Sequence, residues 1–419
     1  MRLINIAGNI RTRDEVIRRE MRQMESGWFN ADAVTRSKQR VDKLGYFTEV
    51  NVEHPAVQGT TDQVDVNVSV TEKPTGNILL GAGFGSGTGA VLSGSVSQQN
   101  IFGSGKFLGL QVSSAKINTI YSLSFLDPYA TPNGISIGAD AYHRKVDAQA
   151  ADLGQYVTRT TGTGIRLGVP ITDDDTIQYG VGYESTTIDV FATSPLYYLD
   201  YVNTFGSHNT ALTPNIAWVR DRRDSLIYPT KGIYQRAYAD VGVPGGSLRF
   251  YRLNYQYQQY FPINRENTLM WNVELGYGAG YGGKPLPFFK NYFAGGVSSL
   301  RGFRLNSVAP RDANNDPRGG TQKFLMNTEL LMPFPGLVND KSVRWSVFTD
   351  VGAVIDPDAP AVAGYENYDS WRRSLRGSIG SSVLWVSPFG PLKFSIAMPV
   401  KTYKLDQKQI FQFTFGGAF

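Results

Sequence analysis

The feature that most constrains this fold is a series of long alternating segments, which occupies the chain from about residue 77 to its end. In residues 271–281, WNVELGYGAGY, aromatic and aliphatic side chains fall on odd positions, whereas Asn272, Glu274 and three glycines fall on even ones. A period of two is typical of strands with one apolar and one polar face. This region is therefore predicted to be all β.

The number and length of these segments favour a membrane barrel. Most of them exceed the average soluble strand of about five or six residues and reach the nine to eleven or so that a tilted membrane strand needs. Clusters of Gly, Pro, Asn or Asp separate the segments, so that sixteen strands are predicted near residues 77–86, 88–100, 105–115, 117–128, 134–147, 153–170, 174–191, 207–221, 231–243, 246–261, 266–282, 319–333, 341–355, 371–386, 390–402 and 407–419.

The connections between these segments alternate in length. The short ones, VPITDDD, FPINREN, MPFPGLVNDK and VSPFGP, share one predicted side, and the long ones, near 191–207, 282–318 and 356–370, share the other. Short turns on one side and long loops on the other are typical of transmembrane β-barrels. We therefore predict a 16-stranded antiparallel transmembrane β-barrel over residues 76–419, with a large soluble β protein as the alternative.

Composition is compatible with this prediction. Charged residues make up 18% and aromatic residues 12% of the chain. No window approaches the roughly 18 consecutive apolar residues of a membrane-spanning helix. A barrel crosses with strands whose two faces average to a moderate hydropathy.

The residues give little support for an enzyme or for a metal or nucleic-acid site. The chain has no Cys and only His54, His143 and His208, which lie far apart in sequence. No G-x-S-x-G elbow accompanies the many serines, and the GSG segments lack the Lys and following helix of a phosphate loop. The net charge is only +5, with no basic run. We therefore expect no catalysis, no cofactor and no nucleic-acid partner.

Residues 1–75 follow a different pattern, which predicts a small α+β domain. A strand, RLINIAGN, precedes a helix that Thr12 and Glu15 would open as a capping box, and a second helix would run from an Asn30 cap to Gly45. Two strands, FTEVNVEHP and VDVNVSVTE, follow. The predicted order is β-α-α-β-β, closed by the linker EKPTG.

The connection at 282–318 carries the most distinctive segment, SSLRGF. Its aromatic residues indicate a loop that packs, and the lumen is the surface available. A confined Arg301 needs an acidic partner. Strand parity turns Glu329 and Asp350 inward, and Glu274 as well, so an ion pair with Arg301 is one interpretation. Ordinary pore-lining charges are the other.

These segments together resemble the BamA/TamA family of outer-membrane assembly factors. Residues 1–75 are similar to that family's POTRA module in GNIRTRDEVIRREM and KLGYF. The barrel is similar in DRRDSLIYPTKG at 221–232, YFAGG at 292–296, SLRGF at 299–303 and FQFTFGGAF at the end. The resemblance covers almost the whole chain.

The resemblance implies an insertase in the bacterial outer membrane, with residues 1–75 in the periplasm. The extracellular loop 282–318 would fold into the lumen, where its motif of Arg301, Gly302 and Phe303 would bring Arg301 to Glu329 and Asp350. Client outer-membrane proteins, recognised by a C-terminal strand signal, would enter the bilayer at a seam between the first and last strands. Accessory outer-membrane lipoproteins would be further partners.

The residues of that seam are expected at both ends of the barrel sequence. The first strand is short and Gly-rich, and Gly416-Gly417 would allow the last strand to kink. An opened seam exposes a strand edge to which a client strand can add. The expected seam residues are Leu79, Leu80, Gly81, Phe411, Phe413, Phe415, Gly416, Gly417 and Phe419.

Two departures from the family pattern leave other functions open. The terminal residue is Phe419 where Trp is common in the family, and a single POTRA-like domain is present. MRLINIAGN does not read as an export signal, so a processed chain or part of a longer one is expected. A two-partner secretion translocator is the main alternative, and a passive porin or receptor is another.

Overall fold

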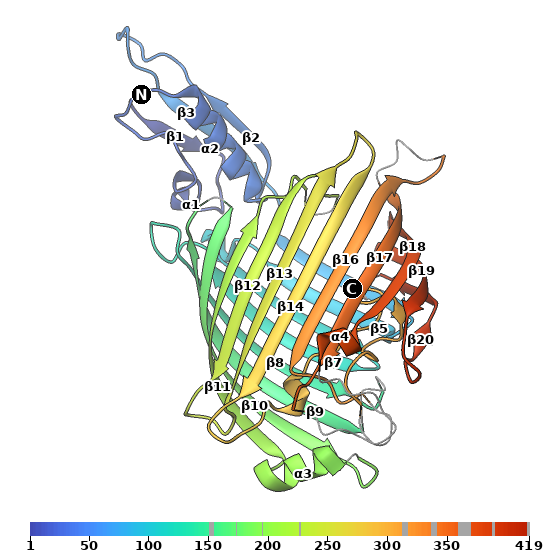
Figure 1. The fold of residues 1–419 in the computed structure, drawn as a ribbon. Helices are drawn as coiled ribbons and strands as arrows, with labels where there is room; N and C mark the ends of the chain where they lie inside the picture. The colour runs from blue at the N-terminus through green and yellow to red at the C-terminus, as the bar shows by residue number, and fades with distance from the viewer. Residues whose placement is uncertain are drawn as a thin grey trace. The chain divides into compact units, whose positions relative to one another are not determined.

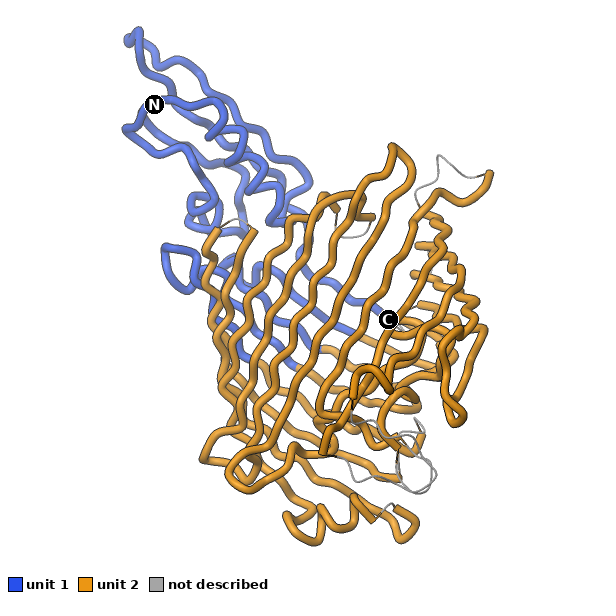
Figure 2. Tube along the Cα trace, in the orientation of Figure 1, with its two compact units in different colours: residues 1–79, 95–110, 123–139 blue, residues 80–94, 111–122, 140–419 orange. Residues whose placement is uncertain are grey.

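The structure is a computed structural model that describes the chain apart from residues 151–154, 173, 195, 226–227, 312–316, 337–341, 359–369, 388–389 and 417–419. Its residues group into two units (Figure 2). Unit 1 comprises residues 1–79, 95–110 and 123–139, and unit 2 comprises residues 80–94, 111–122 and 140–419. This grouping cuts across the predicted division at residue 75, which stays a prediction.

The N-terminal domain has the predicted β-α-α-β-β order. Its sheet has the order β1-β3-β2, in which β1 and β3 are parallel and β2 and β3 antiparallel. The two helices supply Val16, Ile17, Val34 and Val41 to one apolar core with the inward side chains of the sheet. The elements are β1 (Ile4–Ala7), α1 (Asp14–Arg18), α2 (Ala31–Lys43), β2 (Phe47–Glu53) and β3 (Val66–Glu72).

The two helices differ in how well their ends were predicted. Asn30 caps α2 as expected, because its side chain accepts hydrogen bonds from the backbone of Asp32 and Ala33, and Gly45 follows with a φ of 71°. The capping box expected at Thr12 is wrong, since α1 begins at Asp14 without a side-chain cap. The Thr12 hydroxyl instead accepts a hydrogen bond from the Asn100 amide at 2.8 Å.

Sixteen strands form a closed barrel (Figure 1). The register runs through β14, β16, β17, β18, β19 and β21 to β4, so the last strand pairs with the first. In chain order the barrel strands are β4 (Gly76–Gly85), β5 (Gly89–Gln98), β6 (Phe107–Ala115), β7 (Asn118–Asp127), β8 (Ser136–Asp147), β9 (Tyr156–Pro170), β10 (Asp175–Val190), β11 (His208–Asp221), β12 (Gly232–Gly242), β13 (Phe250–Pro262), β14 (Thr268–Gly280), β16 (Gln322–Pro333), β17 (Val343–Ile355), β18 (Arg376–Ser387), β19 (Gly390–Lys401) and β21 (Phe411–Phe415).

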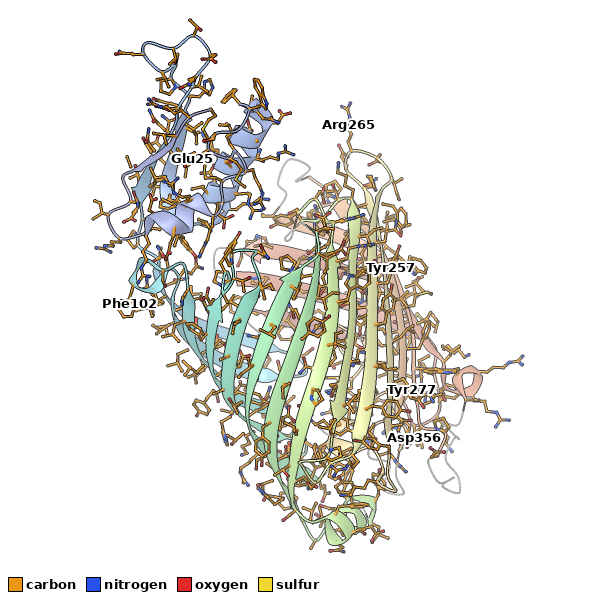
Figure 3. The ribbon with its side chains drawn as sticks, turned by 90° about the vertical axis from the view of Figure 1, so that its left-hand side faces the viewer. Glu25, Phe102, Tyr257, Arg265, Tyr277 and Asp356 are labelled. Carbon is orange, nitrogen blue, oxygen red and sulfur yellow. The ribbon has the colours of Figure 1, made fainter. Side chains whose placement is uncertain are left out.

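Side chains alternate between the two faces of this wall, as the period of two predicts. Side chains project from the strands in both directions in Figure 3, where Tyr257 and Tyr277 mark two adjacent strands, β13 and β14. Outward positions carry exposed apolar residues such as Leu253 and Leu275, and inward positions carry buried polar ones such as Asn272. The helices in the described part of the chain are too short or too polar to span a membrane.

Several connections contain short elements that the period of two did not predict. The predicted strand at 371–386 begins too early, because its first residues form α4 (Trp371–Ser374) and β18 starts at Arg376. The predicted last strand is also too long, since residues 408 and 409 form a separate strand. These additional elements are η1 (Ile101–Gly103), α3 (Leu196–Phe205), η2 (Phe288–Lys290), β15 (Gly302–Phe303) and β20 (Lys408–Gln409).

Candidate functional site

The connection between β14 and β16, called the lumen loop below (residues 281–311 and 317–321), lies inside the barrel. It touches distant parts of the wall: Lys290 binds Glu184 of β10, Arg301 binds Asp350 of β17, and the backbone at Gly302 binds a side chain of β21. A single loop can reach these separate strands only from their common interior. The described part of the loop therefore faces the interior of the barrel.

An aromatic cluster holds the beginning of the lumen loop. Phe288 is 1% exposed, and its ring centroid lies 4.4 Å from that of Tyr198 in α3 and 4.9 Å from that of Tyr156 in β9. Two residues further, the Lys290 ammonium donates to Glu184 at 2.6 Å, and Tyr142 donates to the other oxygen of that carboxylate at 2.7 Å. The loop is thus fixed to the wall before it reaches the SLRGF segment.

Arg301 is almost fully buried, at 2% exposure, and all of its polar contacts point to two carboxylates. Its Nε and Nη2 each donate to one oxygen of Asp350 at 2.7 Å, and its Nη1 donates to Glu329 at 2.9 Å. The face of the guanidinium lies 3.3 Å from the centre of the Phe348 ring. The structure thus brings Arg301 to both carboxylates that strand parity turns inward.

The two carboxylates are themselves held by neighbouring strands. Glu329 of β16 also accepts hydrogen bonds from Ser346 of β17 at 2.5 Å and Ser382 of β18 at 3.2 Å. Asp350 also accepts from the Asn327 amide at 2.8 Å and from the backbone N–H of Arg301 at 3.0 Å. Because every charge has several partners, the burial cost of the site is largely offset. A planar bidentate fork such as Arg301 fits this arrangement better than a point charge.

Glu274, the third carboxylate that parity turns inward, belongs to a different pair. It accepts a hydrogen bond from Lys323 of β16 at 2.8 Å. Parity alone therefore identifies inward charges without assigning their partners.

Gly302 and Phe303 continue the motif toward the last strand of the barrel. Gly302 has a φ of 87°, and an added Cβ would lie 3.2 Å from both Ala397 and Pro399 of β19, so a side chain would be strained and crowded here. Phe303 is fully buried in a cluster with Leu300 and Leu325. Both residues form β15, which pairs with β20 just before the last strand.

A side chain that sequence reasoning did not single out joins the motif to β21. The Gln412 amide donates to the Phe303 carbonyl at 2.7 Å and accepts from the Gly302 N–H at 3.2 Å. It is 1% exposed. Within FQFTF, alternation places Gln412 inward, opposite to its Phe neighbours, but no pattern in the chain points to a partner about 110 positions away.

The seam between β21 and β4 is the shortest described junction of the wall. The described residues of this junction form two pairs, Thr414–Gly85 and Phe415–Phe84, whereas β9 and β10 share fifteen. The Ser86 N–H adds one hydrogen bond, to the Phe413 carbonyl at 2.9 Å. Across the same junction, the rings of Phe84 and Phe413 stack with centroids 5.7 Å apart.

The predicted seam residues fall on both sides of this junction. Seven consecutive residues of β4, from Gly76 to Ala82, are exposed, including Leu79, Leu80 and Gly81. Phe411, Phe413 and Phe415 lie on β21, and Gly416 follows with a φ of 67°. Gly417 and Phe419 lie outside the described residues. The structure thus places Phe415 against Phe84, whereas Leu79 and Leu80 have no β21 partner in the described register.

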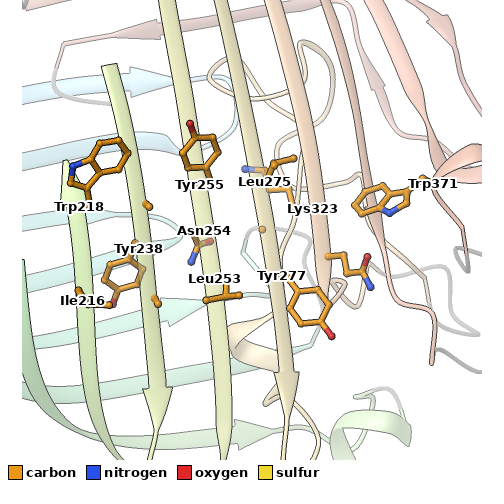
Figure 4. A pocket seen from close by; sticks show the side chains of 14 residues that line it. Ile216, Trp218, Tyr238, Leu253, Asn254, Tyr255, Leu275, Tyr277, Lys323 and Trp371 are labelled. Carbon is orange, nitrogen blue, oxygen red and sulfur yellow. The ribbon is translucent and has the colours of Figure 1, made fainter. Parts of the chain in front are cut away.

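A hollow of about 550 Å³ lies on the outer face of the barrel, with Trp218, Tyr255 and Leu275 among its lining side chains (Figure 4). Ala237 is paired with Trp218 and Tyr255, and Ala239 with Leu253. Most of the lining is apolar, which suits a membrane-facing surface, and its polar side chains include Asn254 and Lys323. Within the described part of the chain, no cluster of His, Asp and Glu is placed to hold a metal ion.

The sequence matches two family descriptions. Residues 100–419 match the Omp85 superfamily domain, and residues 2–73 match the POTRA family, described as a surface antigen variable number repeat. The first match covers most of the barrel, and the second covers the N-terminal domain.

Among curated proteins, the chain is 37% identical to the outer membrane protein assembly factor BamA of Neisseria meningitidis serogroup B, over 99% of this chain and 56% of that protein. It is 27% identical to the BamA of Nitratidesulfovibrio vulgaris, over 99% of this chain and 50% of that protein. The chain thus spans about half the length of the curated relatives it matches.

Among solved structures, the chain is similar to BamA from Haemophilus ducreyi lacking POTRA domains 1–3, with a TM-score of 0.83 and 30% identity over 99% of this chain and 84% of that one. CdiB from Acinetobacter baumannii gives a TM-score of 0.63 over 99% of this chain and 73% of that one, and its 12% identity indicates a shared fold alone.

Proposed function

Because the chain belongs to the Omp85 superfamily and, within it, to the BamA group, we propose that it folds client outer-membrane proteins and inserts them into the bilayer through the seam between β4 and β21. The clients would present a C-terminal strand signal. The barrel would lie in the bacterial outer membrane with the N-terminal domain in the periplasm, where accessory outer-membrane lipoproteins of the assembly complex would be partners.

The short seam is the observation that carries this proposal. A strand edge offers unpaired N–H and C=O groups, to which an incoming strand can add by β-augmentation. Among the described residues, two residue pairs and the Ser86–Phe413 hydrogen bond join the two strands, and seven consecutive residues of β4 are exposed. Opening this described part of the wall therefore breaks fewer hydrogen bonds than opening any of the long junctions.

The work would require no chemical step. A client strand that pairs with an edge satisfies its backbone groups within the bilayer, and its apolar face is then buried in lipid. Both changes favour insertion without nucleotide or metal. We therefore propose a non-enzymatic function, in which the barrel lowers a kinetic barrier and the folding of the client supplies the free energy.

The filled lumen argues against a passive pore. The lumen loop crosses the interior and is bound to several strands of the wall. A two-partner secretion translocator shares the barrel architecture, and no observation on the described residues favours it over the insertase.

Reconstitution in liposomes tests the proposal. The full-length parent protein, with its accessory proteins, is expected to accelerate the folding of an unrelated barrel client relative to empty liposomes. A double variant, Gly85→Cys with Thr414→Cys, tests the seam itself, and its reduced form serves as the control for its oxidised form. An added Cβ at Gly85 lies 3.5 Å from the Thr414 side chain, once the Thr88 hydroxyl turns away, and the chain has no other Cys.

Oxidation of this pair is expected to stop client folding, and reduction to restore it in the same sample. Client folding no faster than in empty liposomes would remove the insertase proposal. Full activity of the oxidised, cross-linked protein would instead remove the seam from the mechanism.

A further inference from the structure

We propose that Gln412 is a positioning residue that couples the lumen loop to the last strand, so that docking of the SLRGF segment and closure of the seam stabilise each other. The biological role of this coupling rests on the proposed function. The coupling itself, between two parts of the barrel, can be measured without a client.

The first observation is the geometry of the Gln412 amide. Its Nε2 donates to the Phe303 carbonyl at 2.7 Å, and its Oε1 accepts from the Gly302 N–H at 3.2 Å. The side chain thus satisfies one donor and one acceptor of consecutive backbone residues, as a neighbouring strand would. At 1% exposure, none of these groups has water as a ready alternative, so separating them leaves buried polar groups unpaired.

The second observation is a short backbone ladder beside this contact. Gly302 is paired with Gln409 and Phe303 with Lys408, and the Arg304 N–H donates to the Gln407 carbonyl at 2.9 Å. The chain then joins the wall, where the Ala397 N–H donates to the Ile410 carbonyl at 2.9 Å. The segment that leads into β21 is therefore held by the loop before it is held by β19.

The third observation is the position of the fixed end. Arg301, directly before Gly302, is bound to Asp350 and Glu329 in the long junctions of β16, β17 and β18. The motif therefore has one end on a firmly paired part of the wall and the other end on β21. Within the described residues, the opposite edge of β21 meets β4 through two residue pairs.

These contacts make the loop and the seam energetically dependent on each other. If β21 must shift to open the seam, it separates from β15 and Gln412 as well as from β4. Thermodynamic coupling is reciprocal, so a loosened loop motif favours an open seam and an open seam loosens the motif. Gln412 carries the side-chain part of this coupling.

The reactivity of one buried thiol can measure the coupling. Thr414 is 5% exposed and faces Gly85 across the seam. In a Thr414→Cys protein, alkylation by a soluble maleimide then reports the fraction of molecules with an open seam, and the chain has no other Cys. In this background, Gln412→Leu removes both amide bonds at similar volume, and Gln412→Asn keeps the amide with less reach.

The matched control is Gln235→Leu. Gln235 lies on β12, and its amide donates to the Tyr255 hydroxyl of β13 at 3.3 Å, in a contact that involves neither the SLRGF segment nor β21. Gln412→Leu is expected to raise the alkylation rate about tenfold, and Gln412→Asn to raise it less, because two net hydrogen bonds are lost or weakened. Gln235→Leu is expected to leave the rate unchanged.

A second measurement separates coupling from simple loss of stability. Arg301→Lys is expected to raise the alkylation rate on its own, but to add little to the Gln412→Leu variant, because the loop is then already detached from β21. Unchanged rates in both Gln412 variants would overturn the proposal, as would strictly additive effects of the two substitutions. If Gln412→Leu does not fold, the same cycle is measured with Gln412→Asn, Arg301→Lys and the double variant, and its additivity decides between the two outcomes.

The outcome is independent of the insertase proposal. A raised alkylation rate with a non-additive cycle supports the coupling even where no client folds faster than in empty liposomes. Conversely, normal client folding with unchanged alkylation in the Gln412 variants removes the coupling and leaves the insertase standing.

Discussion

The ring of Phe413 stacks on that of Phe84 across the junction between the last and first barrel strands, with centroids 5.7 Å apart and planes 15° apart. Phe413 also lies near Phe394 of β19 and Phe411, with centroids 6.4 Å and 5.8 Å away. A row of phenyl rings on the outer face therefore supports a seam that has few backbone hydrogen bonds.

Replacing Phe84 should loosen this seam. Phe84→Leu removes the stack while it keeps an apolar side chain toward the membrane. Aromatic pairs contribute about 0.5–1.5 kcal/mol beyond their buried area, so the open fraction should rise by roughly two- to tenfold. Alkylation of a Thr414→Cys thiol measures it. Trp271→Leu, which removes an aromatic contact with Tyr257 on the outer face of β14 and β13, is the control. Equal rates in both variants would mean that the stack does not hold the junction.

Arg301 should matter more to the barrel than an ordinary lumen cation. Removal of one partner from a buried ion pair typically costs about 3–5 kcal/mol, so Arg301→Ala is expected to lower the temperature at which the barrel loses its compact form on a gel. Arg301→Lys should recover only part of the loss, because an ammonium cannot reproduce the fork to Asp350.

Arg252→Lys serves as the control for that experiment. Arg252 binds Asp240 through Nε and Nη2, at 3.2 and 3.0 Å, in a lumen pair that does not touch the SLRGF segment. Its substitution should cost less than Arg301→Lys. A wild-type melting temperature in both Arg301 variants would argue that the buried network has no structural role.

The part of this site that could be predicted depends on periodicity. Alternation along RWSVFTDVG and KFLMNTELLMP predicts that Asp350 and Glu329 point into the barrel, because successive side chains of a strand point to opposite faces. Alternation also predicts that Glu274 points inward, but it does not indicate which cation binds this carboxylate. In the structure the partner is Lys323 and not Arg301. The family resemblance, rather than strand geometry, selected the partners of Arg301.

Periodicity could not predict the contacts made by irregular segments of the backbone. β15 and β20 are two residues long, too short to show a period, and their pairing joins positions more than a hundred residues apart. Gln412 binds backbone groups, which every residue has. The sequence therefore does not indicate which residues are its partners. α4 is four residues long, also too short to show a helical period, so the sequence predicts strand there.

The N-terminal domain should show an acid-dependent stability centred on Glu72. Its carboxylate accepts hydrogen bonds from the backbone of Arg11 at 2.9 Å and of Thr12 at 2.6 Å. Burial raises the pKa of Glu72, but the hydrogen bonds from Thr12 and Arg11 outweigh it, and the pKa lies below its usual value. The folded state therefore gains stability above the unfolded pKa of about 4.3 and loses it as pH falls through the lower folded value.

Glu72→Gln should remove this gain. Near pH 7 the variant should be cleaved faster by a protease than the parent chain, and the ratio of the two rates should approach one as the pH falls below about 4. Comparing rates at the same pH cancels the pH dependence of the protease. Glu49→Gln, at an exposed position of β2, is the control. A ratio independent of pH would contradict the assigned role of Glu72.

The lumen loop should depend on its second ion pair, between Lys290 and Glu184. Lys290→Met removes the cation beside the Glu184 carboxylate, which keeps the hydrogen bond from the Tyr142 hydroxyl. A buried charge without a counter-ion is costly. The beginning of the loop should then detach from β10 and raise the ionic conductance of single barrels in a planar bilayer. The double variant Lys290→Met with Glu184→Gln removes the stranded charge, so it should conduct less than Lys290→Met. A double variant that conducts at least as well as Lys290→Met would indicate that the aromatic packing of Phe288, rather than charge pairing, holds this end of the loop.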